Sequence, residues 1–427
     1  MKSRSNTKLW IIAAGFIFLF ACEKLEEGIP EKTYIQPIKI GLVGDISAMR
    51  ETVENIHFGA QLAAEEINSK GGLTINGEQR EIQLIYKNSA NNPSIAENTV
   101  YELLLEDINI LIGPTFSNVA VPMADNCLKN DMLMMGYAAT VPYLTEIDTK
   151  DLIWRTCPSD AIFGKLSAQY AYNNLEKRKA GILYRDDTFG QTLASIIEEQ
   201  FVEDGGEVVS KVSFEDASGT DGLDVTRELE DLLLHQPDIL FAVIFNEEIG
   251  NITYGLYNND RYQDYEEKPP LFVNDGVQPQ ELILNGENDV VQTVIGITSN
   301  PDSENNSLFN QNYLVRYGFE NYVFCAHAYD AVYTLAYAMQ RAESTDPLLL
   351  REHLRAVSGS DESISNYQKI NVNEFSKAKS ILLDGGNVNY SGASGNIRFD
   401  QNGDPQPNII IWRITDNEYD VVEELNY

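Results

Sequence analysis

The 427-residue chain is poor in the residue types that most often carry catalysis or bind metals. It has four histidines and four cysteines, and neither type clusters at the spacing of a zinc site or a metalloprotease helix. It also contains no Walker loop, no G-x-G-x-x-G fingerprint and no G-x-S-x-G nucleophile elbow. These absences argue against an enzyme, and they predict a protein that needs no metal and no other cofactor.

The chain also lacks an apolar run long enough to span a membrane. The stretch from Leu9 to Ala21 has thirteen residues, whereas a spanning helix needs about 20. Lys2, Arg4 and Lys8 precede it. A basic flank before a short apolar segment is typical of an export signal, so residues 1–21 are predicted to be a signal peptide and the protein to act outside the cytoplasm.

The end of this stretch, LFAC, resembles the lipobox of bacterial lipoproteins. The resemblance implies that Cys22 is acylated and becomes the mature N-terminus, which would anchor the protein to a membrane facing the periplasm or the cell surface. The alternative is an ordinary cleaved signal followed by an incidental cysteine. Residues 22–37 are polar and contain Pro30 and Pro37, so we expect a lipidated tether there.

Basic residues are scarce in the rest of the chain. Without the three basic residues of the signal, 31 − 3 = 28 remain against 65 acidic residues, a formal charge of −37. Such a body repels phosphate backbones, so we expect no nucleic-acid partner. Three cysteines follow Cys22, and an odd number cannot all pair. We expect small buried hydrophobic residues, with one disulfide possible among Cys127, Cys157 and Cys325.

Short apolar runs alternate with segments of helical spacing along the mature chain. The runs of the first half cover residues 38–47, 81–89, 108–114 and 132–140. From residue 180 the alternation restarts, a helix is expected over about 308–342, and Asn402-Gly403 predicts the turn of a final hairpin. The pattern predicts an α/β protein with two Rossmann-like lobes, each a parallel sheet covered by helices on both faces.

Polar residues follow several of the predicted strands at their carboxyl ends, where α/β proteins bind ligands. Ser117 and Thr140 each stand where a helix or turn should begin, and a helix N-terminus attracts anions. Asp275 ends a strand of the second half and offers a negative charge instead. An anion site on one lobe and a carboxylate on the other predict a zwitterionic ligand such as an α-amino acid. The alternative is that Ser117 or Asn118 merely caps the next helix.

The order of several short motifs resembles the type I periplasmic binding proteins, and within them the branched-chain amino acid group of ABC-transporter solute receptors. The resemblance covers residues 38–427 and rests on IGLVGDIS, GAQLAAEEINSKGG, GPTFSN, MGYAAT, WRTCPSD, YRDDTFGQ, VNDG, AYDAVYTLAYAM and SGASGNIRFDQNGD. Individually these motifs are weak, but their order and spacing are specific.

The resemblance implies roles for particular residues. Ser117 and Thr140 would hold the ligand carboxylate, while the Ala138 carbonyl and Asp275 would face the ligand ammonium. Two positions of the second lobe where family members often carry tyrosine are phenylalanines here, Phe189 and Phe245. Asp160, in WRTCPSD, matches a position near the crossover between the lobes, and we expect it to cap a helix.

The resemblance also implies the domain organisation and the mechanism. The chain would cross between the lobes near residues 157, 300 and 397 through a three-crossing hinge. Lobe 1 would comprise 38–157 plus 301–397, and lobe 2 would comprise 158–300 plus 398–427. The protein, expected as a monomer, would close its hinge on an amino acid-like ligand and deliver it to an ABC permease. A ligand-sensing lipoprotein that feeds a signalling receptor or surface system, and an enzyme on the same fold, are the alternatives.

Overall fold

The computed structural model describes residues 35–47, 50–215, 223–300 and 303–425. The expected signal peptide (1–21), Cys22 and nearly all of the tether lie outside these ranges. The segment from Pro37 to Tyr427 forms one compact unit. Within the described ranges, no helix is both long and apolar enough to cross a membrane.

The first sheet contains five parallel strands in the order β4-β1-β5-β6-β7. Their bounds are β1 (Ile38–Gly44), β4 (Ile82–Asn88), β5 (Ile110–Ile112), β6 (Leu133–Gly136) and β7 (Ile153–Arg155). Neighbouring residues of one strand enter different cores, since Leu42 packs on one face of the sheet and Val43 on the other. Both faces are therefore buried, as the apolar runs predict.

The second sheet contains seven strands in the order β16-β15-β12-β11-β10-β8-β9. Their bounds are β8 (Lys179–Arg185), β9 (Glu207–Phe214), β10 (Ile239–Val243), β11 (Leu271–Val273), β12 (Val294–Ser299), β15 (Ile409–Thr415) and β16 (Glu418–Leu425). The last two strands join as an antiparallel edge, and the others run parallel. Leu240 and Phe241 point into cores on opposite faces.

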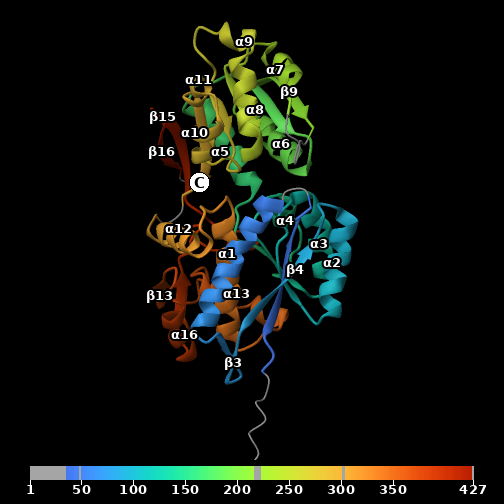
Figure 1. Cartoon of the computed structure of the whole chain (residues 1–427), viewed down its shortest axis with the longest axis vertical. Helices are drawn as coiled ribbons and strands as arrows, with labels where there is room; N and C mark the ends of the chain where they lie inside the picture. The colour runs from blue at the N-terminus through green and yellow to red at the C-terminus, as the bar shows by residue number, and fades with distance from the viewer. Residues whose placement is uncertain (1–34, 48–49, 216–222, 301–302, 426–427) are drawn as a thin grey trace, which may run out of the picture. The chain divides into compact units, whose positions relative to one another are not determined.

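Helices cover both sheets (Figure 1). Those along the first sheet and after it are α1 (Arg50–Ser69), α2 (Pro93–Leu105), α3 (Ser117–Lys129), α4 (Tyr143–Glu146), α12 (Ser303–Tyr317), α13 (Cys325–Ala342), α14 (Pro347–Leu350), α15 (Leu354–Val357) and α16 (Phe375–Leu383). Those among the strands of the second sheet are α5 (Asp160–Asn173), α6 (Thr188–Glu203), α7 (Thr226–Leu233), α8 (Asn246–Tyr257), α9 (Asp260–Gln263), α10 (Pro279–Asn285) and α11 (Asn288–Val291). Two small sheets pair β2 (Leu73–Ile75) with β3 (Glu78–Arg80) and β13 (Tyr367–Ile370) with β14 (Asn387–Tyr390).

We call the part built on the five-stranded sheet the first lobe and the part built on the seven-stranded sheet the second lobe. The chain returns to the first lobe after β12, because residues from Phe309 to Phe399 share a core with β1 and α1. The helix α13 is buried almost all round and packs along α1. The residue boundaries of the two lobes stay a prediction.

Two local predictions were wrong. The helix expected over about 308–342 is two helices, α12 and α13, because the chain leaves α12 at Gly318 with a positive φ of 85°. The final hairpin joins β15 to β16 through Asp416 and Asn417, which both have positive φ. Asn402-Gly403 instead lies in a short loop closed by a bridge between Phe399 and Pro405.

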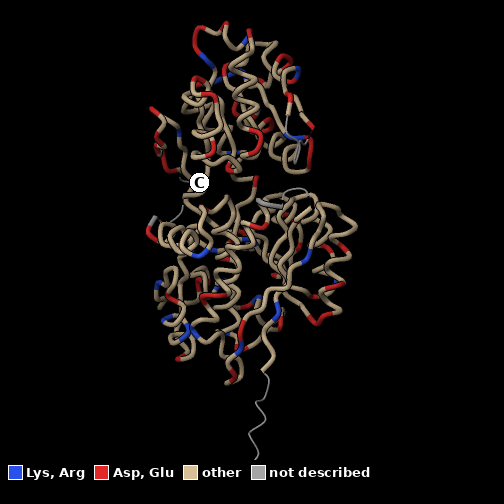
Figure 2. The backbone as a smooth tube through the Cα atoms, viewed as in Figure 1, with Lys and Arg blue, Asp and Glu red and all other residues tan. Residues whose placement is uncertain are grey.

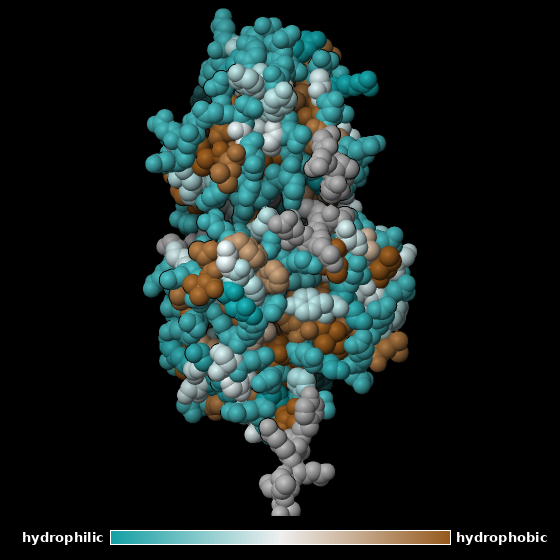
Figure 3. All heavy atoms as spheres, viewed as in Figure 1, coloured by the Kyte–Doolittle hydropathy of each residue, from teal (hydrophilic) through white to brown (hydrophobic). Residues whose placement is uncertain are grey.

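Acidic residues are spread along the backbone of both lobes, whereas basic residues are fewer (Figure 2). The face of the molecule in Figure 3 is mainly hydrophilic, with small separate apolar patches. The charge therefore acts as a general negative field rather than as one acidic patch.

Candidate functional site

A pocket lies where strands of both sheets end, between the two lobes. All six residues predicted to bind the ligand line it: Ser117, Ala138, Thr140, Phe189, Phe245 and Asp275. The structure thus brings together residues from five loops that are far apart in the sequence. Their roles toward a ligand stay a prediction.

The loop after β5 shapes the first-lobe side of the pocket. Gly113 has a φ of 124°, and a Cβ there would collide with the backbone carbonyl of Val43 on the neighbouring strand, so glycine is required. Pro114 follows, and the chain then enters α3 at Ser117. No side chain caps this helix, so the capping role considered for Ser117 and Asn118 is not observed. The first N–H groups of α3 have no partner within the helix and suit an anion.

A hydrogen-bonded chain lies behind this loop. The hydroxyl of Thr115, which lines the pocket, is 2.6 Å from the hydroxyl of Tyr137. The Tyr137 hydroxyl donates to the Val43 carbonyl at 3.1 Å and is 3.1 Å from Nε2 of His57. Burial lowers the pKa of His57 to about 4, so this imidazole is neutral at physiological pH. This series of hydrogen bonds fixes the Thr115 side chain. Thr115 is a pocket residue that was not predicted from the sequence.

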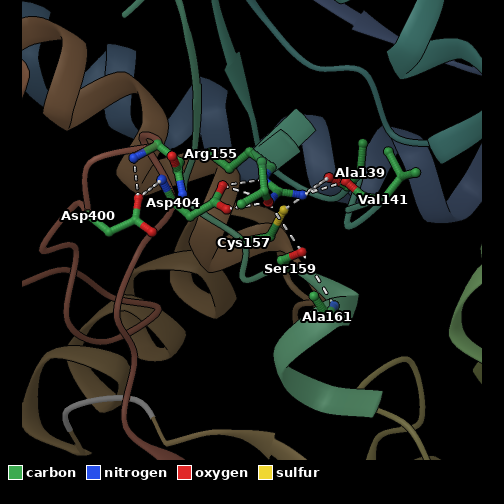
Figure 4. A network of polar contacts seen from close by, with 10 residues as sticks. Ala139, Val141, Arg155, Cys157, Ser159, Ala161, Asp400 and Asp404 are labelled. Atoms are coloured by element: carbon green, nitrogen blue, oxygen red, sulfur yellow. Dashed lines mark hydrogen bonds and ion pairs between the residues drawn. The ribbon is translucent and has the colours of Figure 1, made fainter. Parts of the chain in front are cut away.

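The loop after β6 carries Ala138 and Thr140, and a buried arginine at the end of β7 supports it. Figure 4 shows the guanidinium of Arg155 reaching the carbonyls of Ala139 and Val141, at 3.4 and 3.0 Å. Its Nε donates to the Asp404 carboxylate at 2.7 Å. Arg155 is only 1% exposed, so this pair is shielded from solvent.

Asp275 supplies a buried carboxyl group on the second-lobe side. It follows β11, is 8% exposed, and its pKa is raised to about 7 because burial penalises the charged form. A cationic group beside it would reverse this shift, since an opposite charge favours the ionised carboxylate. Asp275 is therefore suited to hold a ligand ammonium.

Asp160 has a different role from the expected helix cap. Ser159 caps α5, accepting a hydrogen bond from the Ala161 N–H at 3.4 Å, and Asp160 is the first residue of the helix. Neither carboxylate oxygen of Asp160 has a hydrogen-bond partner among the described residues. Burial, and then the charge of Asp275, raise the pKa of Asp160 to about 8. A second buried acid thus lies close to the pocket without lining it.

Two aromatic rings form a wall on the second lobe. The rings of Phe189 and Phe245 stack with centroids 4.8 Å apart and an interplanar angle of 12°. The Arg185 guanidinium carbon lies 4.7 Å from the centroid of the Phe245 ring. Arg185 is itself paired with the carboxylates of Asp187 and Glu248. The two rings therefore give the pocket an apolar surface, and Arg185 with its two carboxylate partners supports the Phe245 ring.

The pocket charge is negative. Its lining includes the carboxylates of Asp187, Glu247 and Asp275, and no lysine or arginine appears among the described lining residues. Asp187 is already engaged with Arg185 and with the N–H of Gly190. Glu247 accepts a hydrogen bond from Thr52 across the pocket at 3.0 Å. Asp275 is thus the pocket acid most available to a ligand cation.

Sequence reasoning missed much of the apolar lining. It comes from α1, from the loop before α3 and from the segment before α13: Ile56, Phe116, Tyr322, Val323 and Phe324. Phe324 has a left-handed φ of 67° at the start of α13. Phe116 lies in GPTFSN, but the other four positions belong to none of the short motifs, and only the fold brings them to the pocket.

The cysteines and histidines form no further site in the described part of the chain. Cys127, Cys157 and Cys325 are buried and free, so the disulfide considered possible is not formed. Burial raises the pKa of each thiol, to about 12 for Cys325. No group of three or more His, Cys, Asp or Glu residues that could hold a metal ion occurs within the described ranges.

Two α/β lobes with a pocket at their strand ends have the fold of the type I periplasmic binding proteins. The chain belongs to the family described as "Receptor family ligand binding region", whose model matches residues 59–417. The fold and the family predicted from the motifs are confirmed.

Named relatives agree with this assignment. The chain is 26% identical over 298 residues to Leu/Ile/Val-binding protein homolog 2 of Brucella abortus, a match that covers 69% of this chain and 76% of the relative. It is 31% identical over 161 residues to the Leu/Ile/Val-binding protein BraC3 of Rhizobium johnstonii, which covers 37% of this chain and only 42% of that relative. It is 23% identical over 376 residues to the chemotactic signal transduction system substrate-binding protein BasB of Halobacterium salinarum, covering 83% and 80%.

Solved structures share the fold. The leucine binding protein LivK of Thermotoga maritima matches with a TM-score of 0.69 at 20% identity, covering 91% of this chain and 99% of that one. The branched-chain amino acid transporter substrate binding protein LivJ of Streptococcus pneumoniae, solved with isoleucine, matches with a TM-score of 0.67 at 20% identity, covering 91% and 100%.

Proposed function

We propose that this chain is an exported solute-binding protein that captures an amino acid, or a related zwitterion, between its two lobes. The observation that carries the proposal is that one pocket has groups suited to bind an anion on one lobe and a buried carboxyl group on the other. Ser117, at the start of α3, and Thr140 line the pocket from the first lobe, and buried Asp275 lines it from the second. A ligand with a carboxylate and an ammonium satisfies both sides.

The rest of the pocket indicates the ligand side chain. Four phenylalanines, Tyr322 and three aliphatic residues belong to its remaining lining, and the charged residues of the described lining are all acidic. An apolar side chain would gain about 25 cal/mol for each Å² it buries, whereas an acidic one would meet like charge. We therefore favour apolar amino acids, in line with the names of the Leu/Ile/Val-binding relatives.

The proposal includes the cellular context. The protein would be exported, lipidated at Cys22, act as a monomer without a metal or other cofactor, and pass its ligand to an ABC permease after the lobes close. Among the described residues that line the candidate site, no nucleophile contacts a base, and we propose binding rather than catalysis. A sensing role is the second candidate, because one relative covering most of the chain is named for a chemotactic signal transduction system.

A thermal-shift screen of residues 37–427, the compact unit, tests the binding function. The panel contains amino acids, short peptides, carboxylates, purines and sugars. A ligand at about a hundred times its Kd stabilises the native state by about 2.7 kcal/mol, which shifts the melting midpoint visibly. We expect a shift with apolar amino acids. A shift only with purines or sugars would refute the proposed ligand class. Loss of uptake, as opposed to loss of chemotaxis, in a deletion strain separates transport from sensing.

A further inference from the structure

Arg155 joins three separate segments of the chain (Figure 4). It is the last residue of β7, and it directly precedes the segment that leads into α5 of the second lobe. Its Nε and one terminal nitrogen both lie 2.7 Å from Oδ1 of Asp404. Asp404 belongs to the segment that leads from Phe399, in the core of the first lobe, to β15 of the second. One buried side chain thus connects two of the paths between the lobes.

The same guanidinium holds the pocket loop that carries Ala138 and Thr140. It donates to the carbonyl of Val141 at 3.0 Å and to that of Ala139 at 3.4 Å. A bridging hydroxyl completes the network, because Thr145 accepts from Arg155 at 2.6 Å and donates to Asp404 at 2.6 Å. Only a planar fork of several N–H donors can make these contacts together, and a lysine ammonium cannot.

The path into α5 also contacts this loop. The backbone N–H of Asp160 donates to the carbonyl of Thr140 at 2.9 Å, and the thiol of Cys157 lies 3.7 Å from the carbonyl of Ala139. The pocket loop is therefore fixed from two sides by segments that lead from one lobe to the other. Its position and the angle between the lobes depend on the same contacts.

We propose that Arg155, acting through Asp404 and Thr145, is a positioning residue of the ligand site that couples the loop of residues 138–141 to the segment of residues 400–408. Arg155 is not among the residues that line the pocket. It sets where Ala138 and Thr140 lie when the second lobe approaches. This inference rests on the proposed function for its affinity readout, but the coupling itself can be measured without a ligand.

The test compares Arg155→Lys and Thr145→Val with Leu232→Ala in residues 37–427. Leu232 is a buried core residue of α7, away from the network, so its truncation controls for lost stability alone. We expect Arg155→Lys to weaken amino-acid binding by about tenfold and Thr145→Val by about threefold in isothermal titration. Leu232→Ala should lower the melting midpoint and leave the affinity unchanged. Parent-like affinity in Arg155→Lys would overturn the inference.

Hydrogen exchange on the ligand-free protein separates this inference from the proposed function. We expect Arg155→Lys to raise exchange in peptides covering both 137–145 and 400–408, and Leu232→Ala to raise it in neither. A parent that binds no amino acid would refute the proposed function. Unchanged protection of the 138–141 amides in Arg155→Lys would still refute the coupling.

Discussion

Replacing Asp275 by asparagine removes the buried carboxylate that we assign to the ligand ammonium, and it keeps the size of the side chain. A hydrogen bond to a charged group contributes about 1.5 to 3 kcal/mol in a protein interior. Because about 1.4 kcal/mol changes an equilibrium constant tenfold, the Kd for the bound amino acid should rise by about tenfold to about 150-fold. Isothermal titration of residues 37–427 at pH above the Asp275 pKa measures this directly.

Asp330→Asn is the matched control for this experiment. Asp330 is also buried, and burial raises its pKa to about 6. It accepts hydrogen bonds from Tyr390, Ala393 and Ser394 rather than lining the pocket. We expect this variant to lower the melting midpoint without changing the Kd. If Asp275→Asn bound the amino acid as tightly as the parent, the assignment of the ammonium site would be wrong.

Four further predictions concern Asp275, Asp160, Ser117 and Cys22. Affinity for the amino acid should fall as the pH is lowered through about 7, because Asp275 then gains its proton and loses its charge; a flat profile in titrations across this range would contradict the assignment. Asp160→Asn should stabilise the ligand-free protein by on the order of 1 to 4 kcal/mol near neutral pH. The pKa of Asp160 in the folded protein is raised from 3.8 to about 8, so Asp160 lowers the free energy of unfolding increasingly as the pH rises from 3.8 to about 8. Denaturant melts of Asp160→Asn should therefore show a free energy of unfolding that depends less on pH than that of the parent. Ser117→Ala should weaken binding by about twofold to about twelvefold through one lost hydrogen bond, and unchanged titration curves would remove Ser117 from the carboxylate site. Cys22→Ser should move the protein from the membrane fraction to the soluble fraction, and a variant that still sediments with membranes would remove the case for lipidation.

Much of the fold could be predicted because local pattern and tertiary structure agree. A β-strand buried on both faces reads as a continuous apolar run, and residues 108–114 and 132–140 show this pattern clearly. The two wrong predictions, the single helix over 308–342 and the hairpin at Asn402-Gly403, concern features that the apolar pattern does not encode. The apolar spacing continues from α12 into α13, so it could not reveal the break at Gly318. The turn at Asn402-Gly403 was recognised, but a turn does not say which strands flank it.

The candidate site could be predicted only where residues stand at strand ends. Ser117, Thr140 and Asp275 were found because the carboxyl ends of parallel strands are where such folds bind ligands. Tyr322 and Phe324 were missed because they come from a loop that no strand precedes. The contact between Arg155 and Asp404 joins residues 249 positions apart, and no local sequence pattern near either residue predicts it.

The most direct test of the account is a set of isothermal titrations with leucine and its two one-ended analogues, isocaproate and isoamylamine, at a pH where Asp275 is ionised. The analogues keep the apolar side chain and remove either the ammonium or the carboxylate. We expect saturable binding of leucine and a loss of at least about tenfold in affinity for each analogue, because each leaves one side of the pocket unsatisfied. Binding of isocaproate as tight as that of leucine, or no binding of any amino acid, would contradict a zwitterion site formed by Ser117, Thr140 and Asp275.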